Sequence, residues 1–225
     1  MKISICFIHY NRINFLLESL RTIKRQSYPD IEIVISDDAS TDETQLMILE
    51  LKNNYKYPIV YYRNEVNLGY DRNYRRAIEL ASGEYCITMG NDDTIIGDDS
   101  ISEVVDFLNG NGCPDLGFVN YFEFSNPNLI IKRATRTTVL GTGLDIAIKY
   151  YNCFSFVGGL IYKRESFLKY NSDIHDGSIY SQMHLGMSMI INGCYLFSID
   201  KPMVGKDIVF KDTKPYSFRD NLVRS

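Results

Sequence analysis

The sequence predicts an α/β fold in which helices flank a mostly parallel central sheet. Short apolar runs that read as buried strands alternate with segments whose apolar residues recur at helical spacing, the pattern of successive βαβ units. The 225 residues are enough for one such domain with a substantial core. We therefore predict a single domain over residues 1–210, followed by a C-terminal tail over 211–225.

The first half of the chain supplies the clearest elements. Strands are expected over residues 3–8, 31–36, 58–62 and 84–89, and helices over 13–23, from about 40 to 51, and over 70–81. The second helix is expected to begin within Ser40-Thr41-Asp42-Glu43, with Ser40 or Thr41 as its N-cap. Ligands collect at the carboxyl ends of parallel strands, and residues 9–12, 37–38 and 91–93 each follow a predicted strand.

Charge and composition exclude several classes of protein. The formal net charge of -4 argues against nucleic acid as the main partner, because phosphate-backbone binding uses clustered Lys and Arg in excess. The five cysteines lack CxxC spacing, which indicates free thiols and a cytoplasmic location. The N-terminal apolar stretch is too short for a signal peptide, and no segment reaches about 18 apolar residues. Basic and aromatic residues over 206–224 leave two alternatives, a solvated tail or a peripheral contact with the inner face of the membrane.

Two pairs of carboxylates close predicted strands. Asp92 and Asp93 follow the fourth strand, and Asp37 and Asp38 follow the second. Carboxylate oxygens are hard ligands that suit Mg²⁺ or Mn²⁺, so the strand end at Asp92-Asp93 is a candidate cation site.

Five segments, taken in order, resemble family 2 glycosyltransferases with the GT-A fold. They are residues 4–12, 36–42, 67–69, 81–85 and 91–93. The resemblance covers roughly residues 1–100, and more loosely 150–205. It implies transfer of a sugar, with inversion, from a nucleoside-diphosphate donor, UDP-sugars being favoured. The acceptor would be a hydroxyl of a saccharide or lipid-linked saccharide in bacterial surface-polysaccharide synthesis. It also divides the domain into a nucleotide-sugar-binding half, 1–100, and an acceptor half, 101–210.

The resemblance indicates which residues would bind the nucleoside of the donor. Ile8, His9 and Tyr10 would line the nucleobase pocket, where the Tyr10 ring could stack on a base or, alternatively, cap the core. Arg12 closes the same segment. Asp38 would accept hydrogen bonds from the uracil or ribose.

The diphosphate end follows from the same resemblance. Asn91 and Asp92 stand in the DXD region, where Asp92 would face the ribose and Asp93 would ligate Mn²⁺ or Mg²⁺. Gly90 stands where many relatives have a first Asp, which leaves two acids instead of three. Arg72 would pair with a phosphate, or would be an exposed helix arginine.

An inverting transferase also needs a general base. The family places an Asp at a helix start about ten residues before a Gly, but counting back from Gly193 leads to residues 181–183, which include no acid. Asp176 and His184 are the nearest candidates. The alternatives are that Asp176-Gly177 forms a turn and that His184 only packs within its helix.

Two other functions stay open at this point. One is a GT-A domain that binds a nucleotide sugar without transferring it, as the missing acid would permit. The other is a sugar nucleotidyltransferase, although such enzymes usually carry a Gly-rich phosphate loop after the first strand, where this chain has residues 9–12 without a glycine.

Overall fold

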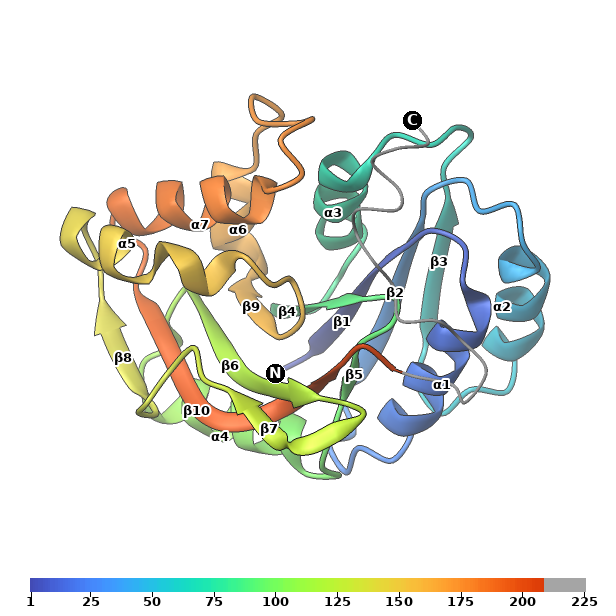
Figure 1. Cartoon of the computed structure of the whole chain (residues 1–225), viewed down its shortest axis with the longest axis horizontal. Helices are drawn as coiled ribbons and strands as arrows, with labels where there is room; N and C mark the ends of the chain where they lie inside the picture. The colour runs from blue at the N-terminus through green and yellow to red at the C-terminus, as the bar shows by residue number, and fades with distance from the viewer. Residues whose placement is uncertain (209–225) are drawn as a thin grey trace.

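The structure is a computed structural model that describes residues 1–208, and in this part of the chain ten strands form one sheet (Figure 1). The strands are β1 (Ile3–His9), β2 (Ile31–Asp37), β3 (Ile59–Arg63), β4 (Tyr85–Gly90), β5 (Thr94–Ile95), β6 (Leu116–Glu123), β7 (Asn126–Ile131), β8 (Thr138–Gly141), β9 (Leu160–Lys163) and β10 (Leu196–Lys206). The helices are α1 (Ile13–Ile23), α2 (Thr44–Lys52), α3 (Tyr70–Glu79), α4 (Ser100–Gly110), α5 (Leu144–Tyr150), α6 (Arg164–Tyr170), α7 (Ser181–Ile191) and the short 3₁₀ helix η1 (Tyr151–Phe154).

The sheet has a parallel part and a mixed part, in the order β3-β2-β1-β4-β9-β6-β10-β5. Strands β3, β2, β1 and β4 pair in parallel, as the βαβ pattern predicts. Strand β9 joins β4 to β6 through antiparallel pairing on both sides, and β6 pairs in parallel with β10. The predicted α/β fold is confirmed, and the second half of the chain adds the antiparallel strands.

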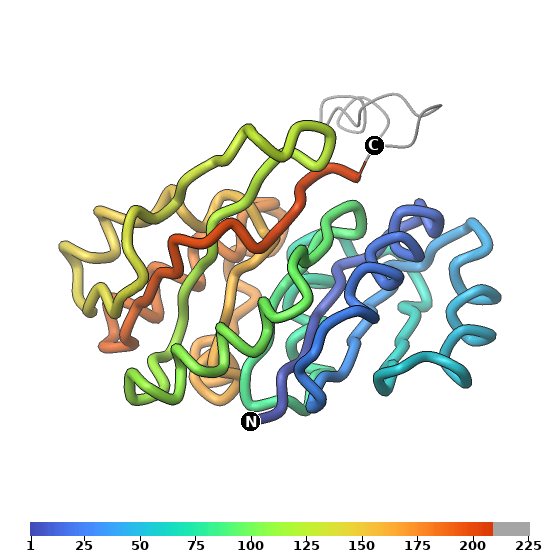
Figure 2. The backbone as a smooth tube through the Cα atoms, turned by 90° about the horizontal axis from the view of Figure 1, so that it is seen from below, coloured from blue at the N-terminus to red at the C-terminus, as the bar shows by residue number. Residues whose placement is uncertain are grey.

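Helices cover both faces of the sheet, and each face has its own apolar core. On one face, residues of α1, α2 and α4 share a core with alternate residues of β1, including Ile3, Ile5 and Phe7. On the other face, residues of α3, α5, α6 and α7 share a core with the intervening residues of the sheet, including Cys6 and Ile8. Figures 1 and 2 show the two halves of the chain side by side along this continuous sheet. The strand ends that carry the predicted site residues therefore meet at one edge.

The predicted strands and helices of the first half agree with the structure to within two residues, except for the start of α2. That helix begins at Thr44, not within residues 40–43. The Ser40 hydroxyl instead accepts a hydrogen bond from the Asn11 backbone N–H (2.8 Å), and Asp42 accepts one from Ile13 (3.0 Å). These side chains fasten the loop after β1, so they are not available to cap a helix at residue 40.

Two expectations concern the membrane and the tail. Across residues 1–208, none of the helices combines the length and the apolar character needed to cross a bilayer. The predicted domain boundary at 210, the tail over 211–225 and most of the basic and aromatic segment lie outside the described residues.

Candidate active site

A cavity of about 490 Å³ opens at the carboxyl edge of the parallel strands, which is within the size range of small-ligand pockets. Its walls come from the loops after β1, β2 and β4, from the start of α3, from the segment before β9 and from the end of β10. The lining residues are Ile8, His9, Tyr10, Arg12, Asp38, Asn67, Gly69, Tyr70, Asn73, Gly90, Asn91, Asp92, Asp93, Phe156, Val157, Lys206 and Asp207. Eight of the sequence-predicted residues, Ile8, His9, Tyr10, Arg12, Asp38, Asn91, Asp92 and Asp93, thus share one cavity.

Asp38 forms one end of the cavity and organises the loop before α3. It is 3% exposed. Its carboxylate accepts hydrogen bonds from the Asn64 side-chain amide (2.8 Å) and from the backbone N–H groups of Leu68 (2.8 Å) and Gly69 (2.9 Å). One oxygen has two of these donors and the other has one, which leaves acceptor capacity for a ligand on a carboxylate that is fixed in place.

His9 and Tyr10 lie beside Asp38. The His9 ring is buried, and this burial lowers its pKa to about 4, although the nearby Asp37 and Asp42 carboxylates oppose the shift. The ring is therefore neutral, and its Nε2 lies 2.9 Å from the Thr44 hydroxyl, which itself donates to Asp42. Since the threonine proton is engaged, His9 donates from Nε2. Tyr10 is 45% exposed and is among the residues that line the cavity.

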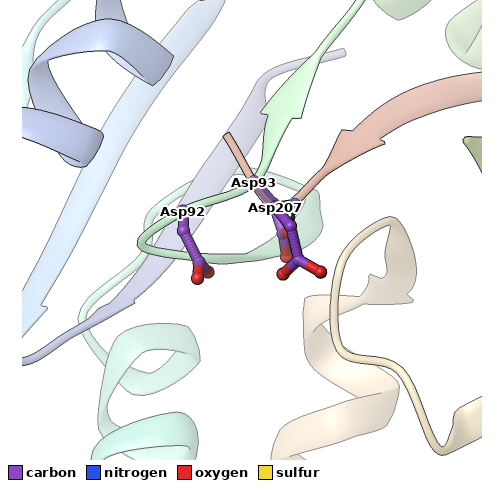
Figure 3. Close-up of side chains that lie close together, drawn as sticks. All are labelled: Asp92, Asp93 and Asp207. Carbon is purple, nitrogen blue, oxygen red and sulfur yellow. Dashed lines mark hydrogen bonds between the residues drawn. The ribbon is translucent and has the colours of Figure 1, made fainter. Parts of the chain in front are cut away.

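Three carboxyl groups gather at the other end of the cavity. Ligand oxygens of Asp92, Asp93 and Asp207 lie within 4.8 Å of one another, and Figure 3 shows the side chains pointing to the same side. Asp92 and Asp93 come from the loop after β4, and Asp207 directly follows β10. Asp93 also accepts long hydrogen bonds from the backbone N–H groups of Asp207 and Gly90, both 3.3 Å.

The surroundings of Asp93 suit a divalent cation. Burial, followed by the charge of Asp92, raises the pKa of Asp93 well above its ordinary value, because a desolvated carboxylate beside another acid is unfavourable. Within residues 1–208, no lysine or arginine forms an ion pair with Asp93. A hard cation would supply the missing positive charge, and three carboxylate ligands are a donor set that Mn²⁺ or Mg²⁺ accepts.

Two cations flank the acidic cluster. Arg12 Nη1 lies 2.7 Å from Asp92 Oδ2, and Lys206 Nζ lies 2.7 Å from Asp207 Oδ2.

The loop after β1 has an unusual backbone conformation: Arg12 is left-handed (φ 63°), as is Asn11 (φ 56°). Such a conformation costs of order 1–3 kcal/mol and persists where surrounding bonds enforce it. Here Asn91 donates its side-chain amide to the carbonyls of Tyr10 and Asn11, which ties the β1 and β4 loops together.

Arg72 does not line the cavity. Its Nη1 lies 2.8 and 2.9 Å from the two Glu79 carboxylate oxygens, two helical turns further along α3. A contact between Arg72 and a diphosphate stays a prediction.

Asp176 and His184, the two candidate bases, also lie outside the cavity lining. Asp176 forms a bidentate ion pair with Arg75 of α3, which is 5% exposed. The His184 ring stacks on His175 with centroids 4.0 Å apart. Ser181 and Gln182, at the start of α7 where the family has its acid, are both buried. The assignment of the base stays a prediction.

Sequence reasoning missed Asp207 and the anchoring role of Asp71. Asp207 lies 114 residues after Asp93, and the antiparallel pairing of β10 with β5 brings the two together. Asp71 accepts hydrogen bonds of 2.7–2.9 Å from the backbone N–H groups of Gly177, Ile179 and Ser181. It thereby fixes the start of α7 to α3, and no local pattern at residue 71 indicates this long-range role.

Solved structures of glycosyltransferases share this architecture. Residues 1–349 of S. aureus TarS in complex with UDP superpose with a TM-score of 0.74 at 18% identity, over 91% of this chain and 60% of that one. The mannosyltransferase PcManGT from Pyrobaculum calidifontis, in complex with GDP-Man and Mn²⁺, gives a TM-score of 0.68 at 17% identity, over 94% and 58%. At these identities the similarity establishes the fold, which is GT-A.

The chain belongs to glycosyl transferase family 2, whose family model matches residues 4–170. It is 35% identical to the abequosyltransferase RfbV of Salmonella typhimurium, over 91% of this chain and 66% of that protein. It is also 30% identical to a poly-β-1,6-N-acetyl-D-glucosamine synthase of Staphylococcus epidermidis, over 62% of this chain and 31% of that protein. The chain thus spans less than two thirds of the length of these relatives. The predicted family and fold are confirmed.

Proposed function

We propose that this chain transfers a sugar, with inversion, from a nucleoside-diphosphate sugar to an acceptor hydroxyl, and that it uses Mn²⁺ or Mg²⁺. The observation that carries the proposal is one cavity with Asp38 at one end and Asp92, Asp93 and Asp207 at the other. A nucleotide sugar needs both ends: hydrogen-bond acceptors for a base or ribose, and a cation site for a diphosphate.

The charges of the cavity support a metal-assisted donor site. The lining contains four carboxyl groups and two cationic side chains, so an anionic diphosphate would be repelled unless a divalent cation bound with it. Asp93 and Asp207 would hold that cation, and Asp92 would hold it or face the ribose. Arg12 and Lys206, already at the cluster, would exchange part of their carboxylate contacts for phosphate oxygens.

In the proposed reaction the acceptor oxygen attacks the anomeric carbon as the bond to the diphosphate oxygen breaks. The bound cation would stabilise the negative charge on the departing diphosphate. The hydroxyl proton passes to a general base, for which Asp176 and His184 are our candidates. Asp176 would have to leave Arg75 to act in this way.

The wider assignment rests on the relatives. UDP and UDP-GlcNAc occupy structures of TarS, and one relative is named as a glucosyltransferase that acts on an undecaprenol-linked saccharide. We propose a UDP-sugar as the favoured donor and a saccharide or lipid-linked saccharide of a surface polysaccharide as acceptor. The five free cysteines are consistent with a cytoplasmic location, and a lipid-linked acceptor would bring the protein to the inner face of the membrane.

A direct test incubates the protein with a panel of nucleotide sugars and Mn²⁺, with and without saccharide acceptors, and measures released nucleoside diphosphate. We expect slow donor hydrolysis, faster turnover with the right acceptor, and loss of both in Asp93→Ala. Donor binding without turnover on any acceptor would favour the non-catalytic alternative. Consumption of a nucleoside triphosphate with release of pyrophosphate would favour a nucleotidyltransferase.

The base is tested by comparing Asp176→Asn with His184→Ala. A positioned general base contributes about 10²- to 10⁴-fold, so replacing it should lower the transfer rate by that factor and leave donor affinity unchanged. If each variant loses less than about tenfold, another group accepts the proton.

A further inference from the structure

Arg133 lies in the connection between β7 and β8, and its side chain has an unusual set of partners. As a whole residue it is half-buried, but its guanidinium is enclosed by protein, and this burial lowers its pKa to about 10, so the group stays charged at neutral pH. The rings of Phe118, Tyr121 and Phe156 surround it, with centroids 5.2–5.7 Å from the guanidinium carbon.

Within the described part of the chain, the guanidinium donates to backbone carbonyls and to no side chain. Nε bonds to Val119 O in β6 (2.9 Å). Nη1 bonds to Cys153 O (3.2 Å) and Phe156 O (3.0 Å), and Nη2 bonds to Gly158 O (2.7 Å). One side chain thus ties β6 to three carbonyls of the segment 153–158. Arginine can do this because its planar fork presents five N–H donors in fixed directions, which lysine cannot reproduce.

The segment 153–158 forms the cavity wall beside the acidic cluster. Phe156 and Val157 line the cavity. Gly158 lies so close to Asp93 that a Cβ at residue 158 would stand 2.9 Å from the Asp93 Oδ2. Two further contacts hold the segment: the hydroxyl of Thr88 in β4 donates to Val157 O (2.8 Å), and the Phe154 ring is buried in the core against Phe118. Arg133 adds the hydrogen bonds that hold the Phe156 and Gly158 carbonyls beside the cluster.

The positive charge of Arg133 is solvated without an acidic partner in the part of the chain that the structure describes. Among residues 1–208, no Asp or Glu forms an ion pair with it, although the charge of Asp93 acts on it from a distance. Carbonyl dipoles and ring faces solvate the cation in place of a carboxylate. A fixed positive charge behind the wall favours anions at the acidic end of the cavity.

We infer that Arg133 is a positioning residue for the sugar-diphosphate half of the donor, because it holds the segment 153–158 against the acidic cluster. The inference rests on the proposed function, since it presumes a nucleotide sugar in the cavity. It assigns no role to Arg133 at the nucleoside end, which is formed by residues of the β1 loop, the β2 loop and the start of α3.

The test compares ligands that reach the wall with ligands that do not. The probes are UDP, CDP, GDP and ADP with MnCl₂, each beside its monophosphate, titrated calorimetrically into the wild type and into Arg133→Gln and Arg133→Lys. For the diphosphate that binds the wild type, we expect Kd to rise about tenfold in Arg133→Gln and at least about fivefold in Arg133→Lys, because neither side chain can hold three carbonyls. The monophosphate Kd should change by less than about twofold.

Arg164→Gln is the matched control. Arg164 also donates to two backbone carbonyls, Ile78 O (3.4 Å) and Glu79 O (3.1 Å), but it does not line this cavity. It should lower the melting temperature without changing either Kd. Equal losses for monophosphate and diphosphate in the Arg133 variants, or no loss for either, would overturn the inference. A wild type that binds none of the diphosphates would instead refute the proposed function, and the inference with it.

Discussion

Replacement of Asp38 by Asn changes one carboxylate oxygen to an NH₂ group in the wall of the cavity. The carboxylate, 3% exposed, accepts from Asn64, Leu68 and Gly69 at 2.8–2.9 Å, and it forms no ion pair within residues 1–208. An amide offers one acceptor oxygen, and its NH₂ would face an N–H donor in either orientation.

The size of the effect follows from these bonds. A hydrogen bond to a charged group contributes about 1.5–3 kcal/mol, and an unpaired buried donor costs about 1–3 kcal/mol. We expect Asp38→Asn to lower the free energy of unfolding by about 2–4 kcal/mol, since part of the set survives. For a chain of this size that corresponds to about 4–16 °C in melting temperature. The control is Asp98→Asn, whose 53%-exposed carboxylate pairs with Arg25 and should contribute under about 1 kcal/mol.

The same variant has a distinct binding phenotype. Asp38 orders the loop that contributes Asn67 and Gly69 to the cavity, so its replacement should weaken monophosphates and diphosphates alike, in contrast to the Arg133 variants. Thermal melts and calorimetric titrations measure the two effects. A melting temperature within about 1 °C of the wild type, with unchanged nucleotide affinity, would refute this account of Asp38.

Three further changes test the fold and the acidic cluster. Burial alone would raise the pKa of Glu32, but its hydrogen bonds outweigh burial and lower the pKa to about 2. The stabilisation that Glu32 provides is therefore complete above the unfolded pKa of 4.5 and is lost as the pH falls toward 2. In urea melts, the stability advantage of the wild type over Glu32→Gln should shrink by about 2 kcal/mol between pH 7 and pH 3, and a constant difference would contradict this. In Gly158→Ala the added Cβ would stand 2.7 Å from the Phe156 ring and 2.9 Å from Asp93 Oδ2, so it should displace both and weaken Mn²⁺-dependent diphosphate binding about tenfold. Gly110→Ala, with nothing within 4 Å of its Cβ, should leave titrations unchanged. Asp71→Asn should lower stability by about 2–4 kcal/mol and speed proteolysis between residues 170 and 181, and equal cleavage rates would argue against its anchoring role.

The grouping of the candidate site residues around one cavity could be predicted from sequence because they stand directly after strands with clear apolar patterns. Asp38 and Asp93 are examples: parallel pairing of β1, β2 and β4 brings their strand ends to one edge. The family resemblance in the same segments then indicated what kind of ligand that edge would take.

The remaining parts depend on pairings between distant segments. Asp207 reaches the cluster because β10 pairs with β5, where Gly205 lies opposite Thr94. Arg133 reaches the segment 153–158 because β6 and the β7–β8 connection lie beside it. The ion pair between Asp176 and Arg75 spans 101 residues, so the local Asp-Gly pair could indicate a turn but not its partner. Local sequence patterns predict at which strand end a residue lies. They do not predict which side chains from distant segments will contact that residue.

The central claim is that the cavity binds a nucleoside diphosphate together with a divalent cation held by the acidic cluster. The most direct measurement is a thermal-shift titration of UDP, CDP, GDP and ADP, with and without Mn²⁺, on the wild type and on Asp93→Ala. At about 100 times its dissociation constant, the right ligand should add about 2.7 kcal/mol, or about 5–11 °C, to the wild type with Mn²⁺. Asp93→Ala should show little or none of that shift. Absence of a metal-dependent shift with every diphosphate, or an equal shift in Asp93→Ala, would contradict the claim.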